Sequence, residues 1–95
     1  MNNFIYNPPK TPFLTVLYED EYIMVVDKPS GLLSVPGREK ANYDSILSRI
    51  WESYPDAMAV HRLDMDTSGI MAVGLKKESI SALGRMFKQK EVHKL

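Results

Sequence analysis

Apolar and polar residues alternate near the start of the chain, and this pattern predicts two short β-strands. Over residues 14–18 the large apolar side chains recur at every second position, as in a strand with one buried face. After the acidic segment YEDEY, the β-rich run over residues 23–26 predicts a second strand. Pro29 and Gly31 follow directly and predict a turn.

Helical spacing of apolar residues appears in the middle of the chain. The segment NYDSILSRIWESYP, residues 42–55, predicts the first helix. Asn42 is the expected N-cap, Asp44 lies in the expected first turn near the positive end of the helix dipole, and Pro55 is the expected stop. The apolar face of this helix comprises Ile46, Leu47, Ile50, Trp51 and Tyr54.

The remaining pattern predicts a strand and a second helix. The run GIMAVGLKK, residues 69–77, is typical of a buried strand, and residues 78–90 are typical of a helix that Gly84 weakens. One side of that helix carries the apolar residues Ile80, Leu83 and Phe87. The other side carries Ser81, Arg85 and Lys88. We expect another strand to begin within residues 91–95. The order strands, helix, strand, helix predicts an α+β fold.

Length and composition limit the possible functions. The chain has 95 residues and no cysteine, so we expect one small domain without disulfides or thiol chemistry. Its net charge of zero argues against a strongly basic nucleic-acid binder. No apolar run approaches membrane-spanning length and the first residues lack signal-peptide features, so we expect a cytoplasmic protein. Residues 1–12, rich in Asn and Pro, predict an extended arm rather than a packed element.

The stretch HRLDMDTSG, residues 61–69, concentrates charged groups between two apolar runs. Its second half is explained by a turn, because Asp66, Thr67 and Ser68 can bond nearby backbone. Gly69 can adopt backbone conformations that are closed to other residues. The first half, HRLD, is not explained in this way, because a turn has no need of these four residues in series.

Two chemical alternatives use the acidic residues of this stretch. A metal site would take His61, Asp64 and Asp66, although no second histidine lies at helical spacing. The segment DMDTSG also matches the D-x-D-x-T pattern of haloacid-dehalogenase-like phosphatases. In those enzymes the first aspartate would be the nucleophile, the second the acid and base, and Mg²⁺ would be bound between them. That loop follows a continuous apolar strand, whereas charged residues directly precede Leu63 here.

The whole stretch closely resembles the signature H-R-L-D-x-x-T-S-G of the RluA-type pseudouridine synthases. MVVDKPSGLLSVPG, residues 24–37, resembles the family's upstream strand–turn motif, and GIMAVGLKK resembles its continuation after the signature. The arm YNPP and the segment VPGR resemble the branch that modifies both a tRNA anticodon stem and a hairpin of 23S ribosomal RNA. The resemblance covers nearly the whole chain, but only the N-terminal part of the family's catalytic domain.

The resemblance implies roles for individual residues. Asp64 would be the catalytic carboxylate, acting either as a nucleophile or as a base and electrostatic stabiliser. Arg62 would contact RNA and fill the gap left by a flipped base, and His61 would orient the loop through a hydrogen bond. Lys28 is a candidate for phosphate contact. The loop-shaping residues would be Thr67, Ser68 and Gly69. The reaction requires no cofactor, and no metal is implied.

The resemblance also implies a fold and partners. We expect a mixed, mostly antiparallel sheet with two helices, in which residues 13–95 form a partial catalytic domain that lacks the later active-site strands. Structured rRNA or tRNA would be the partner. A domain cut in this way would be inactive alone and would self-associate through its open sheet edge. Two alternatives remain: the phosphatase and a non-catalytic RNA-binding module.

Overall fold

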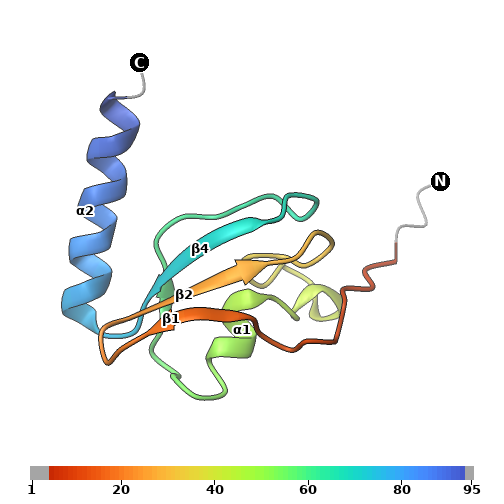
Figure 1. Cartoon of the computed structure of the whole chain (residues 1–95). Helices are drawn as coiled ribbons and strands as arrows, with labels where there is room; N and C mark the ends of the chain where they lie inside the picture. The colour runs from red at the N-terminus through yellow and green to blue at the C-terminus, as the bar shows by residue number, and fades with distance from the viewer. Residues whose placement is uncertain (1–4, 94–95) are drawn as a thin grey trace.

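The computed structural model describes residues 5–93, with side chains for residues 5–86. It contains one antiparallel four-stranded sheet in the order β1-β2-β4-β3 (Figure 1). The strands are β1 (Val16–Glu19), β2 (Ile23–Lys28), β3 (Met58–Ala59) and β4 (Gly69–Gly74). The helices are the 3-10 helix η1 (Lys40–Asn42), α1 (Ile46–Ile50) and α2 (Lys77–His93). The predicted α+β fold, with a mostly antiparallel sheet and two α-helices, is confirmed.

The central pair of strands, β2 and β4, sets the geometry of the functional end of the sheet. Their antiparallel register runs from Ile23 opposite Gly74 to Lys28 opposite Gly69. The last residue of β2 therefore lies beside the first residue of β4. Because of this register, the loop that follows β2 and the loop that precedes β4 meet at one end of the sheet.

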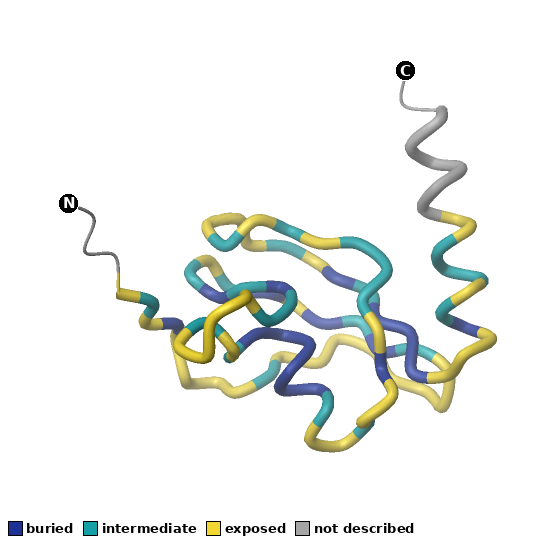
Figure 2. The backbone as a smooth tube through the Cα atoms, turned by 180° about the vertical axis from the view of Figure 1, so that it is seen from behind, coloured by how far each residue is buried: buried dark blue, intermediate teal, exposed yellow. Residues whose placement is uncertain are grey.

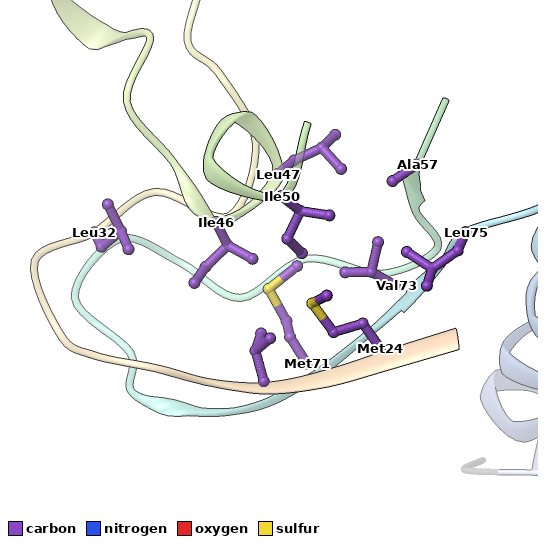
Figure 3. Close-up of a cluster of buried hydrophobic side chains, with 10 residues drawn as sticks. Met24, Leu32, Ile46, Leu47, Ile50, Ala57, Met71, Val73 and Leu75 are labelled. Atoms are coloured by element: carbon purple, nitrogen blue, oxygen red, sulfur yellow. The ribbon is translucent and has the colours of Figure 1, made fainter. Parts of the chain in front are cut away.

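The hydrophobic core lies between α1 and one face of the two central strands. Figure 3 shows the core side chains converging there, and Figure 2 shows buried residues concentrated along the same elements. The main contributors are Met24, Val26, Ile46, Leu47, Ile50, Met71 and Val73. Alternation along β4 turns Ile70 to the opposite face, where it is 64% exposed. The strand predicted over residues 69–77 thus ends at Gly74 and is buried on one face only.

The first helix is shorter than predicted and has a different N-cap. Ser45 is the cap: its hydroxyl accepts a hydrogen bond from the Ser48 N–H, and the Ser48 hydroxyl accepts one from the Ser45 N–H. This reciprocal pair satisfies two N–H groups, where a single asparagine cap would satisfy one. Asn42 belongs to η1 instead, and Asp44 precedes the helix. The helix ends at Ile50, well before the predicted proline stop.

The second helix continues further than predicted. Gly74 lets α2 approach the end of β4, because a Cβ there would lie 2.6 Å from the Ile80 Cγ1 atom. The strand expected from residue 91 is wrong over residues 91–93, where α2 continues to His93 without a glycine or proline to stop it. Residues 94–95 lie outside the described residues. The side chains of Phe87 and Lys88, which the sequence assigned to the two faces of the helix, also lie outside the described part. Among the described residues, no helix has the length and apolar character needed to span a membrane.

The described part of the N-terminal arm, residues 5–12, lies outside the helices and strands and is mostly exposed, but hydrogen bonds tie it to the rest of the domain. The Tyr6 hydroxyl donates a hydrogen bond to the Asp44 carbonyl at 2.7 Å and accepts one from the Leu33 N–H at 2.9 Å. The buried Arg49 guanidinium pairs with the Asp44 carboxylate and also donates to the Pro9 carbonyl at 2.8 Å. These long-range bonds were not visible in the composition of the arm.

Candidate active site

Two loops meet at the end of the sheet where β2 stops and β4 begins (Figure 1). They comprise residues 29–34 and residues 60–68, and the pairing of Lys28 with Gly69 brings them together. Gly31 within the first loop and Gly69 directly after the second have positive φ angles of 93° and 155°, a region that favours glycine. The conformation of Gly69 agrees with its predicted part in shaping the loop.

Main-chain hydrogen bonds hold the turn around Asp64. The Thr67 N–H donates to the Asp64 carbonyl at 2.9 Å and closes the turn. The carbonyl of the next residue, Met65, accepts two bonds from the opposite loop: one from the Gly31 N–H at 2.8 Å and one from the Lys28 ammonium at 3.0 Å. The peptide unit that joins Met65 to Asp66 is therefore held by two residues more than thirty positions earlier in the chain.

Two serines extend these contacts to both sides of Asp64. The Ser30 hydroxyl donates to the Asp66 carbonyl at 2.9 Å. The Ser34 hydroxyl donates to the Leu63 carbonyl at 2.7 Å and accepts from the Leu63 N–H at 2.9 Å. Sequence reasoning missed both serines. The available signal was a single polar residue in the apolar run LLSV, which is buried here although serine is usually exposed.

The Lys28 side chain is fully buried and is not exposed for the predicted phosphate contact. Its ammonium group donates to three main-chain carbonyls at 2.6–3.0 Å. These acceptors belong to Pro29, Leu32 and Met65. Burial lowers the pKa of Lys28, and the nearby carboxylates of Asp66 and Asp64 oppose that change. Lys28 is therefore an internal clamp between the two loops and places a positive charge beneath the acidic turn.

His61 accepts a hydrogen bond through its ring. The Ala72 N–H of β4 donates to the His61 Nε2 atom at 3.1 Å, which requires this nitrogen to be unprotonated. Burial lowers the pKa of His61, in agreement with a neutral ring. Since β3 pairs only with the last two residues of β4, His61 occupies the strand edge where that pairing has ended. This bond supports the predicted orienting role of His61.

Arg62 and Asp64 both point to an open pocket. Both side chains are exposed, and the pocket is lined by residues 33–35 and 62–65. Thr67 and Ser68 are exposed, and their side chains make no hydrogen bond within the described residues, so the main chain shapes the turn there. Among the residues that the structure describes, no group of three or more His, Cys, Asp or Glu side chains is placed to hold a metal ion.

Comparison with known proteins identifies the family. The sequence model of the RNA pseudouridylate synthase family matches residues 22–95. The chain belongs to this family. Among curated relatives, the dual-specificity RNA pseudouridine synthase RluA of Salmonella typhi is 57% identical over 89 residues, which are 94% of this chain and 41% of that protein. The corresponding protein of Escherichia coli strain K12 is 54% identical over the same shares. The chain thus spans about two fifths of these relatives' length.

Solved structures of the RNA pseudouridylate synthase fold agree with this assignment. Human RNA Pseudouridylate Synthase Domain Containing 4 superposes with a TM-score of 0.63 at 22% identity, covering 81% of this chain and 30% of that one. Human RNA Pseudouridylate Synthase Domain Containing 1 gives a TM-score of 0.60 at 24% identity, covering 94% of this chain and 31% of that one. At these identities the likeness concerns the fold.

Membership of the RNA pseudouridylate synthase family leaves the phosphatase interpretation without support. The geometry also disagrees with a phosphatase loop, which follows a continuous apolar strand. Here β3 has two residues, and a loop that includes the charged residues His61 and Arg62 separates it from Asp64. The match to D-x-D-x-T is therefore accidental, since Asp66 lies outside the lining of the pocket that Asp64 shares with Arg62.

Proposed function

We propose that this protein, at the full length encoded by its gene, isomerises uridine to pseudouridine in structured RNA. Family membership supports the proposal, and one structural observation indicates which residues would take part. The main chain on both sides of Asp64 is fixed by the loop after β2, while the Asp64 carboxylate stays exposed beside Arg62 in an open pocket. Rigid backbone combined with an accessible carboxylate suits a catalytic group.

The proposed chemistry needs a carboxylate at the glycosidic carbon. The bond between C1′ and N1 of uracil breaks, the base turns over, and a bond between C1′ and C5 forms. The hydrogen on C5 leaves as a proton, and N1 takes up a proton, so no atoms are gained or lost overall. Asp64 is the group proposed to act at C1′, either as the nucleophile or as the stabilising base. The reaction as written uses no cofactor or metal.

Arg62 is proposed to act on the RNA rather than on the glycosidic bond. A base inside a stacked RNA must leave its stack before an enzyme can reach C1′, and a side chain that fills the gap offsets part of the cost. The planar guanidinium can stack on neighbouring bases or hold a phosphate with two hydrogen bonds. Its exposure on the rim of the pocket that contains Asp64 leaves it accessible for this role.

The names of the relatives support RNA as the substrate, and the resemblance of YNPP and VPGR to the dual-substrate branch suggests two particular RNAs. The Salmonella and Escherichia relatives are named dual-specificity enzymes. We propose a hairpin of 23S ribosomal RNA and a tRNA anticodon stem-loop as substrates, and the cytoplasm as the location. Residues 13–95 would form part of the catalytic domain, with residues 1–12 as an arm that precedes it. RNA of this kind is recognised by its shape and by splayed bases, which a near-neutral domain can do.

The deciding experiment measures tritium release from RNA that carries 5-tritiated uridine. The full-length protein should release tritium from a 23S hairpin or an anticodon stem-loop without added metal. A protein that binds both RNAs but releases no tritium would be a binding module, and the proposed function would be wrong. The full-length Asp64→Asn variant serves as the control, and should bind both RNAs without releasing tritium.

A further inference from the structure

Ser34 lies on the wall of the pocket that Asp64 lines, and its hydroxyl has an unusual pair of partners. The side chain is buried, with 3% of the residue exposed. Its Oγ atom donates to the Leu63 carbonyl at 2.7 Å and accepts from the Leu63 N–H at 2.9 Å. One hydroxyl thus satisfies both main-chain groups of a single residue 29 positions later in the chain.

The position of Leu63 gives these two bonds their importance. Its N–H belongs to the peptide unit that joins it to Arg62, and its carbonyl belongs to the peptide unit that joins it to Asp64. The Ser34 hydroxyl therefore holds the two peptide planes from which the proposed RNA-contacting and catalytic side chains extend. The Leu63 side chain itself packs against the core and lies near Gly69. Rotation of either peptide plane would break a bond to Ser34.

Ser34 stands on a rigid support. Its own carbonyl accepts a hydrogen bond from the Leu47 N–H at 3.0 Å, and the preceding Leu33 carbonyl accepts one from the Ile46 N–H at 2.9 Å. Both donors belong to the first turn of α1, whose side chains are in the core. The Leu33 N–H is taken by the Tyr6 hydroxyl. The main chain of the segment that carries Ser34 is therefore fixed by contacts of its own, separate from the bonds between the Ser34 hydroxyl and Leu63.

We propose that Ser34 is a positioning residue for the isomerisation: its hydroxyl sets the directions of Asp64 and Arg62 through the Leu63 main chain. This inference rests on the proposed function. Displacement of a catalytic group by about 1 Å costs on the order of 100-fold in rate. We expect Ser34→Ala to lower kcat on a stem-loop RNA by about 10- to 100-fold, with a smaller change in RNA affinity, because the peptide planes can then rotate.

A matched control separates positioning from stability. Ser79 is another buried serine whose hydroxyl bonds three main-chain groups, but these belong to Tyr22 and Lys76 at the opposite end of β4. Ser79→Ala should lower the melting temperature about as much as Ser34→Ala and leave kcat unchanged well below melting. Ser34→Thr retains the hydroxyl and should recover most of the lost activity.

The experiment is a set of single-turnover tritium-release assays on the full-length wild type and the three variants, with melting curves for each protein. A second measurement is hydrogen exchange of the Leu63 amide, which should speed up in Ser34→Ala and stay slow in Ser79→Ala. If the wild type is active and Ser34→Ala matches Ser79→Ala in kcat, the Ser34 inference is overturned and the proposed function stands. Unchanged Leu63 exchange in Ser34→Ala also overturns it, even if that variant melts too low to assay. An inactive wild type overturns the proposed function, and the role of Ser34 in it.

Discussion

The Lys28 ammonium and the Met65 carbonyl lie 3.0 Å apart, across 37 positions of sequence. This contact joins the end of β2 to the turn that carries Asp64. The same ammonium also donates to the carbonyls of Pro29 and Leu32, so one buried cation binds three main-chain acceptors. The carboxylates of Asp66 and Asp64 favour its charged form, although burial has the larger effect and lowers the pKa of Lys28. Lys28 therefore has two effects on the site: it holds the two loops together, and it places a positive charge near Asp64 and Asp66.

Lys28→Met should destabilise the protein, because it removes the clamp between the two loops. Three carbonyls, one buried and two partly buried, lose their donor, which we expect to cost about 2 kcal/mol of unfolding free energy. Lys76→Met is the matched control, because Lys76 forms an exposed ion pair with Glu21 whose loss should cost much less. Thermal unfolding of the full-length variants tests this. Equal melting temperatures for the two variants would contradict the clamp.

Asp64→Asn should abolish pseudouridine formation and leave folding and RNA binding intact. The two side chains are nearly isosteric, but the amide lacks the negative charge needed at the glycosidic carbon. Asp66→Asn is the control and should keep substantial activity, because the Asp66 side chain lies outside the lining of the pocket. Tritium release from a stem-loop RNA measures both. Full activity of the Asp64 variant would rule out its catalytic role.

Arg62→Lys should reduce turnover on folded RNA by on the order of tenfold, and affect RNA binding less. Lysine keeps the charge but lacks the planar group that can stack in the gap left by a flipped base. Arg85→Lys, on the exposed surface of α2, serves as the control and should change neither quantity. Single-turnover rates and filter-binding affinities separate the two effects. Equal rates for Arg62→Lys and wild type would exclude a role in base flipping.

His61 should make stability depend on pH in a defined direction. Burial lowers its pKa in the folded protein below the ordinary value of 6.5, so the unfolded chain binds the proton more tightly. The stabilising contribution is therefore complete above pH 6.5 and is lost as the pH falls through the folded pKa. Asp44, whose pKa the Arg49 guanidinium lowers, acts only at lower pH, below its ordinary 3.8.

His61→Gln tests this dependence, because the glutamine carbonyl can still accept the Ala72 N–H but does not titrate. Urea unfolding of both proteins at several pH values should show a loss of wild-type stability on acidification below pH 6.5 that is smaller in the variant. Parallel curves for the two proteins would show that His61 is not the group responsible.

Residues 1–95 expressed alone should self-associate through the edge of the sheet. β1 is an edge strand, all four of its residues are exposed, and Leu17 is 53% exposed. Such edges pair with other chains unless they are blocked. Leu17→Lys should weaken the association, whereas Ile5→Lys, on the arm, should not. Sedimentation velocity over a range of concentrations measures it, and a monomer at every concentration would count against the proposal.

The sequence by itself determined the local elements and the chemical identity of the site. The strand predicted over residues 14–18 and the β-rich run before Lys28 correspond to β1 and β2, because such patterns lie in neighbouring residues. The buried face expected for the first strand was wrong, since all four residues of β1 are exposed. The signature HRLDMDTSG identified the family for the same reason: its residues are contiguous. Gly69 was also predictable, since its positive φ angle is a local requirement of the turn.

Only the tertiary structure decided which polar side chains hold that signature in place. Lys28 looked like a surface cation and Ser34 like an interruption in an apolar run, yet both bond the turn around Asp64. Their partners depend on the register that puts Lys28 opposite Gly69, which no local pattern contains. The cap of α1 is different: its partners Ser45 and Ser48 are three positions apart, so a local pattern could have indicated it. Buried hydrogen-bonding groups must find partners, and where the partners of Lys28 and Ser34 lie is settled by strand pairing rather than by nearness in sequence.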